Sequence, residues 1–168
     1  MTALRLAGAA LASLLAGCAA SPPLTDGLPA TAARQVELDS TPFFAQDDFQ
    51  CGPAALATLL VASGVDVTPE SLAPEVFIPG REGSLSLELI GAARRHGRLP
   101  YVLATTAHEM VAELEAGRPV LVLQNLGTGA LPKWHYAVVI GYDAGRNVAI
   151  LRSGREPRLE MKWQRFAG

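Results

Sequence analysis

The first half of the chain has apolar positions at helical spacing. Residues 51–63 are strong helix formers, with a proline in the first turn and a glycine directly after the run, which predicts a mostly buried helix beginning at Cys51. Apolar spacing predicts a second helix over residues 84–97. A capping-box pattern, in which a threonine is followed three residues later by a glutamate, opens a third over residues 106–117.

After Pro119 the pattern changes to that of β-strands. Three continuous apolar runs and one alternating stretch follow, and a tight turn at residues 143–146 joins two of them. The predicted strands, including a short one before the first helix, are residues 35–38, 120–124, 134–142, 147–152 and 159–166. Helices followed by an antiparallel sheet indicate the α+β fold class.

The N-terminus has the layout of a bacterial export signal. Arg5 precedes an uninterrupted small and apolar run over residues 6–16, which is too short to span a bilayer as a helix. Residues 15–18, Leu-Ala-Gly-Cys, resemble the lipobox of bacterial lipoproteins, in which the cysteine becomes the new N-terminus. We therefore expect residues 1–17 to be a signal peptide and Cys18 to carry lipid. An ordinary secretory signal with an incidental cysteine is the alternative.

The segment after the signal predicts how the protein is held in the cell envelope. Ala19 follows the cysteine in place of aspartate, which resembles lipoproteins sorted to an outer membrane, here facing the periplasm. Residues 18–34 are rich in Ala, Ser, Pro and Thr without periodicity, so we expect a flexible, lipid-anchored tether. Residues 35–168 then form one domain with a single core.

Charge excludes one class of partner. The chain carries 14 basic and 16 acidic side chains, and removal of residues 1–17 takes away one arginine, which leaves a net charge of −3. Such a balance gives no indication of nucleic-acid binding. Neither the residues nor their spacing implies a metal or another cofactor.

Cys51 is the main candidate for chemistry. Acylation of Cys18 leaves it the only thiol in an exported protein, so no intramolecular disulfide can form. A cysteine in the first turn of a helix has a lowered pKa, because the backbone donors and the helix dipole favour the thiolate. We expect Gly52 to let a substrate backbone approach the sulfur. An inert buried cysteine is the alternative.

A nucleophilic thiol needs a base, and His135 is the best placed of the three histidines. It opens an apolar strand from a different part of the predicted fold. His96, in the last turn of its helix among arginines, and His108, in a first turn, have simple interpretations as solvated surface residues.

Four short segments add a pattern that no single residue carries. They are residues 46–56 (Gln-Asp-Asp-Phe-Gln-Cys-Gly-Pro-Ala-Ala-Leu), 83–84 (Gly-Ser), 117–122 (Gly-Arg-Pro-Val-Leu-Val) and 135–143 (His-Tyr-Ala-Val-Val-Ile-Gly-Tyr-Asp). Together they resemble the bacteriocin-processing double-glycine peptidases of the papain-like superfamily. The resemblance implies a papain-like fold with the nucleophile at a helix N-terminus packed on an antiparallel sheet. It also implies that the side-chain amide of Gln46 completes the oxyanion hole, with Gln50 as the alternative.

The residue that orients the imidazole departs from the family, which has an aspartate or asparagine on the strand after the histidine. Asp143 lies eight strand residues from His135, or about 26 Å away. Counting back across the hairpin places the orienting position at residues 152–154, where no carboxylate stands. Ser153 is the candidate there, and Glu156 is a more distant substitute.

These residues predict a cysteine peptidase of the cell envelope. Its partners would be a peptide or protein substrate and, through the lipid, a membrane. Two alternatives remain: a catalytically impaired papain-like module that only binds peptides, and an amidase that cuts cell-wall peptides.

Overall fold

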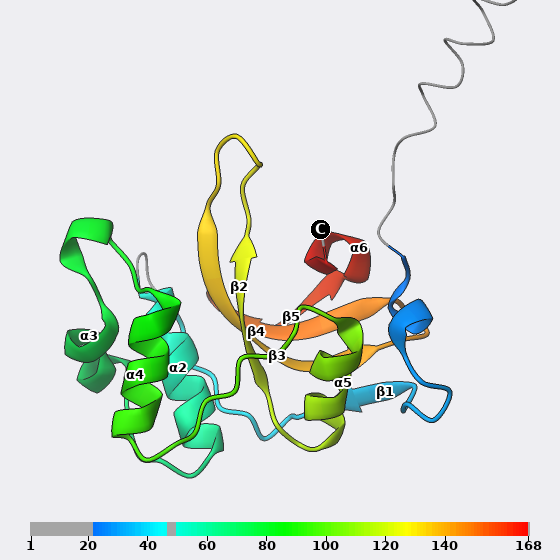
Figure 1. The fold of residues 1–168 in the computed structure, drawn as a ribbon, viewed down its shortest axis with the longest axis horizontal. Coiled ribbons are helices and arrows are strands. Elements are labelled where there is room, and N and C mark those ends of the chain that lie inside the picture. The colour runs from blue at the N-terminus through cyan, green and yellow to red at the C-terminus, as the bar shows by residue number, and fades with distance from the viewer. Residues whose placement is uncertain (1–21, 47–49, 168) are drawn as a thin grey trace, which may run out of the picture.

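The computed structural model describes residues 22–46 and 50–167. The predicted signal peptide and Cys18 lie outside these residues. Within them, no helix is long and apolar enough to cross a membrane. The expected α+β class is confirmed, with helices packed on an antiparallel sheet (Figure 1).

The helices largely follow the sequence pattern. They are α2 (Cys51–Ala62), α3 (Pro69–Val76), α4 (Ser86–Arg95), α5 (Ala107–Glu115) and α6 (Trp163–Ala167), with short 3-10 turns at Leu24–Gly27 and Pro79–Arg81. The sequence pattern did not predict α3, which begins with a capping box between Thr68 and Ser71. At the start of α5 only half of the expected box forms, because Glu109 Oε2 accepts from the N–H of Ala104 instead.

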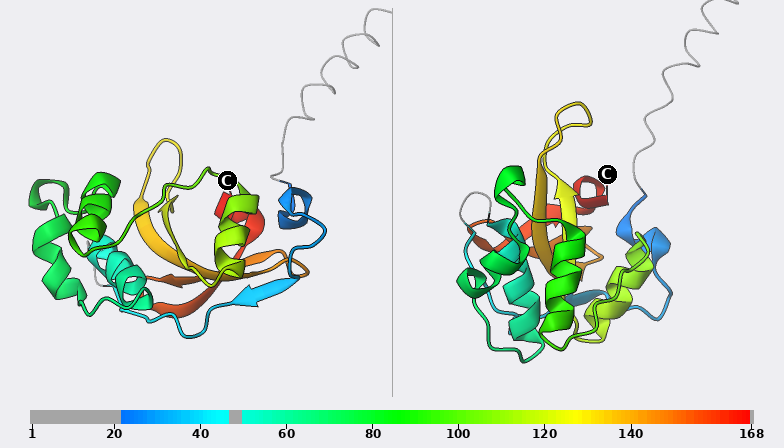
Figure 2. Two further views of the ribbon diagram at one scale, coloured as in Figure 1. Left: turned by 60° about the horizontal axis from the view of Figure 1, so that its bottom comes forward. Right: turned by 60° about the vertical axis from the view of Figure 1, so that its left-hand side comes forward.

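The strands form one curled antiparallel sheet (Figures 1 and 2). They are β1 (Gln35–Glu37), β2 (Val120–Asn125), β3 (Trp134–Asp143), β4 (Val148–Ser153) and β5 (Glu156–Lys162). β3 is central: β4 pairs along one edge, and β2 and β1 follow one another along the other. The strand expected over residues 159–166 begins earlier and ends at Lys162, because the chain then turns into α6 and buries Trp163.

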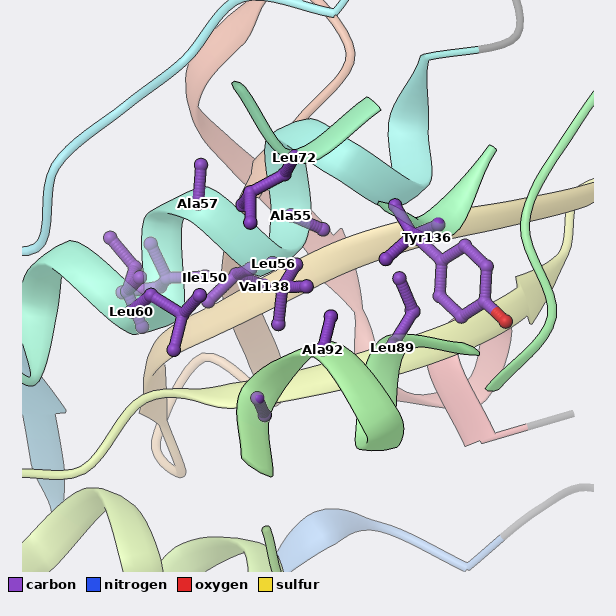
Figure 3. Close-up of a cluster of buried hydrophobic side chains, with 13 residues drawn as sticks. Ala55, Leu56, Ala57, Leu60, Leu72, Leu89, Ala92, Tyr136, Val138 and Ile150 are labelled. Atoms are coloured by element: carbon purple, nitrogen blue, oxygen red, sulfur yellow. The ribbon is translucent and has the colours of Figure 1, made fainter. Parts of the chain in front are cut away.

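β3 has a hydrophobic cluster on each face, which explains its continuous apolar run. Tyr136 and Val138 belong to the cluster under α2, α3 and α4 (Figure 3). Ala137 and Val139 belong to the second cluster, with residues of α5, α6 and β5. Successive side chains of a strand point to opposite faces, so residues 136–140 alternate between the two clusters. A register shift between Val139 and Gly141 ends this alternation, and Tyr142 lies in the second cluster.

The predicted flexible tether is wrong for the part that the structure describes. Leu24 is fully buried in the second cluster, and its N–H donates to Asn147 Oδ1 at 2.9 Å. Ala33 donates its N–H to Glu115 Oε1 at 2.6 Å and accepts from the Tyr142 hydroxyl at 2.9 Å. The packed domain therefore begins before residue 35.

Leu24→Ala should destabilise the domain by about 2–5 kcal/mol, because it leaves a cavity among buried apolar side chains. Urea denaturation measures the free energy of unfolding. Thr25→Ala is the matched control: Thr25 is exposed on the same turn, and its loss should change stability by about 0.5 kcal/mol or less. Equal effects of the two substitutions would mean that this segment contributes nothing to the core.

Candidate active site

Cys51 is the first residue of α2, as the sequence predicts. Gln50 occupies the N-cap position, and its side chain makes no capping hydrogen bond. The thiol therefore sits at the positive end of the helix dipole, near backbone donors that no cap side chain satisfies. Cys51 is partly buried against the cluster of Figure 3.

Gly52 has a packing role in place of the one expected from the sequence. A Cβ atom at this buried position would overlap the side chain of Ser84. The glycine thus lets the segment before α4 pack against the first turn of α2. The prediction that its missing side chain makes room for a substrate backbone is not supported, because Ser84 fills that space.

The thiol lies near the beginning of β3. Burial raises the pKa of Tyr136, and a hydrogen bond of 3.0 Å between its hydroxyl and Ser86 Oγ opposes this increase. The charge of Cys51 raises the pKa of Tyr136 further, which shows that the thiol is close to this ring. Figure 3 shows Tyr136 on β3 beside Leu89 of α4. Since Tyr136 follows His135, the helix that carries the candidate nucleophile and the strand that carries the candidate base meet here.

Within the described chain, the imidazole of His135 makes one hydrogen bond, to Ser153. The distance between Nε2 and Ser153 Oγ is 3.0 Å. Ser153 ends β4, and the turn after it has Gly154 in the left-handed region at φ 58°, which a glycine tolerates at the first position of a two-residue hairpin loop. The bond occupies one ring nitrogen and leaves Nδ1 for another partner.

The other residues weighed for the orienting position lie elsewhere. Asp143 is at the far end of β3, opposite Val148, and its Oδ1 accepts from the N–H of Arg146 at 2.9 Å. Arg152 donates to the carbonyl oxygen of Thr41 at 2.8 Å, away from the imidazole. Glu156 faces Ser153 across the β4–β5 ladder, while the bond of the imidazole goes to Ser153.

Gln46 is buried next to the same turn. It is 8% exposed, and its N–H donates to the carbonyl oxygen of Gly154 at 2.9 Å. Its Oε1 is buried without a hydrogen-bond partner within the described chain. A buried amide without its full set of partners is costly unless something else supplies them. Gln50, the alternative, is exposed.

Two features of the environment lower the pKa of His135. Burial is the larger cause, because it disfavours the charged imidazolium, and the positive charge of Lys133 is the second. The free protein should therefore hold this imidazole neutral at neutral pH, which is the form that can accept a proton.

Contact between Cys51 and His135 stays a prediction, since no hydrogen bond joins them among residues 22–46 and 50–167. His108 is exposed, as expected. His96 is half-buried instead of fully solvated, and its Nε2 pairs with Glu75 Oε1 at 2.9 Å. Nor do the described residues bring three or more His, Cys, Asp or Glu side chains together as a metal site.

Sequence reasoning missed a buried amide beside the imidazole. Gln124 lies directly opposite His135 in the β2–β3 ladder and is 9% exposed. Its Nε2 contacts Met161 Sδ at 3.5 Å, and its Oε1 has no partner within the described chain. The available signal was a polar residue at the end of an apolar run, paired in register with the histidine.

A family model described as the Peptidase_C39 like family matches residues 38–163. The chain belongs to this family. The expected resemblance to papain-like C39 peptidases is thereby confirmed, and the family points to a cysteine peptidase, a hydrolase. No curated protein matches this C39-like chain.

Two solved structures resemble this C39-like chain. A crystal structure of a candidate C39-like peptidase from Bacillus anthracis has a TM-score of 0.62 at 19% identity, over 80% of this chain and 91% of that one. At this identity the likeness establishes the fold. A double glycine motif protease from an AMS/PCAT transporter, solved with its leader peptide, has a TM-score of 0.49 at 16% identity, over 82% and 87%.

Lys133→Gln should raise the pKa of His135, because a nearby positive charge no longer opposes protonation. The pKa should stay below the usual value of about 6.5, since burial, the larger cause, remains. A proton NMR titration of the imidazole measures it. Lys162 is an exposed lysine at the end of β5, opposite Val148 of β4, and Lys162→Gln should leave the titration unchanged. A titration that Lys133→Gln does not move would remove Lys133 from the site.

Proposed function

We propose that this chain is a cysteine peptidase of the cell envelope. Its observational basis is the hydrogen bond between His135 Nε2 and Ser153 Oγ. This bond orients a half-buried imidazole at the start of the strand on which the helix of Cys51 packs. The family and the position of the thiol at a helix N-terminus support the same chemistry.

The proposed reaction is acyl transfer in two steps. His135 accepts the thiol proton, and the sulfur of Cys51 forms a bond to the substrate carbonyl carbon. The C–N bond then breaks as the imidazolium gives its proton to the leaving amine. Water, deprotonated by His135, attacks the thioester and releases the acid with the free thiol. Gln46 and the N–H of Cys51 stabilise the oxyanion in both steps.

Ser153 sets the expected strength of this catalysis. A hydroxyl can hold the imidazole in position, but it stabilises the imidazolium formed during attack less than a carboxylate would. This substitution also favours a second candidate, a papain-like module that binds a peptide and cuts it slowly or not at all.

We also propose that the protein is anchored to the envelope through Cys18, with its domain in the periplasm. The support is the apolar run ending in Leu-Ala-Gly-Cys. The substrate is accordingly a peptide, protein or cell-wall peptide outside the cytoplasm.

Cleavage of peptide libraries and muropeptides tests the function. Cys51→Ala should abolish hydrolysis, and Ser153→Ala should lower the rate by about tenfold at most, since one neutral hydrogen bond contributes about 0.5–1.5 kcal/mol. Ser153→Asp should raise it, because a charge stabilises the imidazolium. The control Asp143→Asn changes a carboxylate at the far end of the same hairpin and should have no effect.

The two candidate functions give different results in this assay. No turnover by the wild type or by Ser153→Asp, with peptides still bound, would replace the peptidase with the binding module. Turnover of muropeptides alone would identify a cell-wall amidase.

Cys18→Ser should release the protein from membranes in detergent partitioning, because the acylated side chain is lost. The mature wild-type mass should include acyl groups. A variant that still partitions with membranes, together with a wild-type mass without acyl groups, would show that the anchor is not there.

A further inference from the structure

The loop between β2 and β3 exposes large apolar side chains. We call residues 126–134 the hairpin tip. Leu131 is 80% exposed, Trp134 61% and Leu126 40%. Figure 1 shows the hairpin projecting beyond the rest of the fold. Exposed apolar groups gathered at a projecting tip are unusual on a free surface and mark a contact with something else.

The composition of the hairpin tip fits a lipid surface. Its sequence is Leu-Gly-Thr-Gly-Ala-Leu-Pro-Lys-Trp, with Lys133 as its one charged residue. Tryptophan is enriched where a bilayer meets water, because its ring is apolar and its N–H can still be hydrated. A lysine can keep its ammonium group among lipid headgroups while its stem lies against apolar surface.

The backbone of the hairpin tip is already folded on itself. Five of its N–H groups donate within the loop or to the Asn125 side chain, namely those of residues 126, 127, 128, 131 and 133. Gly127 is needed for this fold, since a Cβ there would overlap the carbonyl oxygen of Leu131. Paired backbone groups cost little to bring near hydrocarbon, whereas unpaired ones cost several kcal/mol.

The chain between the proposed lipid and the domain is short. Leu24 is fixed in the core, and only five residues, 19–23, lie between it and Cys18. The six Cα-to-Cα steps from Cys18 to Leu24 reach about 22 Å at full extension. An acylated Cys18 would therefore hold the side of the domain that carries Leu24–Gly27 close to the bilayer.

The hairpin tip lies on that side. In all three views of Figures 1 and 2, the blue end of the described chain starts on the side of the molecule toward which the hairpin points. A lipid at Cys18 thus brings the exposed leucines and Trp134 toward the same membrane.

We propose that the hairpin tip is a second membrane contact, which places Leu131 and Trp134 at the headgroup level of the bilayer to which Cys18 is anchored. This inference rests on the lipidation proposed above. Trp134 immediately precedes His135, so the contact would position the candidate active site just above the membrane surface.

Tryptophan fluorescence of the acylated mature protein in phosphatidylethanolamine and phosphatidylglycerol vesicles tests the proposal. Lipids with brominated acyl chains should quench the emission of Trp134 and leave that of Trp163, which is 7% exposed. The quenched component should disappear in Trp134→Phe. Leu131→Ser should lose most of the quenching, because a polar side chain weakens insertion.

Leu99→Ser is the matched control, since Leu99 is 76% exposed outside the hairpin. In this variant the brominated lipids should quench the emission of Trp134 as they do in the wild type. An acylated, vesicle-bound protein with unquenched Trp134 would overturn the second contact and leave the anchor and the peptidase standing. The tip would then be free for a protein partner. A mature chain without acyl groups would overturn both the anchor and this contact, with no consequence for peptide cleavage.

Discussion

β3 is covered on both faces, and this constraint organises the rest of the molecule. One face packs under α2, α3 and α4, and the other packs on α5, α6 and β5. Because strand side chains alternate, Tyr136 is directed to the cluster under α2, α3 and α4, while the ring of His135 reaches Ser153 at the end of β4. A shift of one residue in register would exchange them. The burial of the following residues of β3 on both faces therefore holds His135, which is itself half-buried, beside the last residue of β4.

The electrostatics around His135 distinguish this chain from a papain-like site with a carboxylate. Burial and Lys133 both disfavour the imidazolium, and the hydroxyl of Ser153 offers only a dipole against them. The resting imidazole is then a neutral base with little help once it is protonated. Two buried amides, of Gln46 and Gln124, each leave an oxygen without a partner within the described chain. Unpartnered polar groups are costly in a core, and a role in a site is one of the reasons for which they are kept.

The sequence predicted the parts of the fold whose causes are local. The helix at Cys51 has its start and stop within a few residues, and the place of Ser153 beside His135 follows from counting along one hairpin. The features that the sequence did not predict depend on partners far away in the chain. Leu24 is one leucine in a segment of small residues, and its burial requires Asn147, 123 positions away. Gln124 reaches Met161 only because the sheet curls.

The two proposals are coupled through Lys133, which belongs to the hairpin tip and also acts on His135. In water its charge is one of the two causes that hold the pKa of the imidazole down. Among anionic headgroups, the negative surface potential would offset that charge. His135 would then accept a proton more readily, and the imidazolium needed during attack would be less costly. A hairpin that touches the membrane would therefore raise the pKa of His135, while the same imidazole in solution would stay the weaker base.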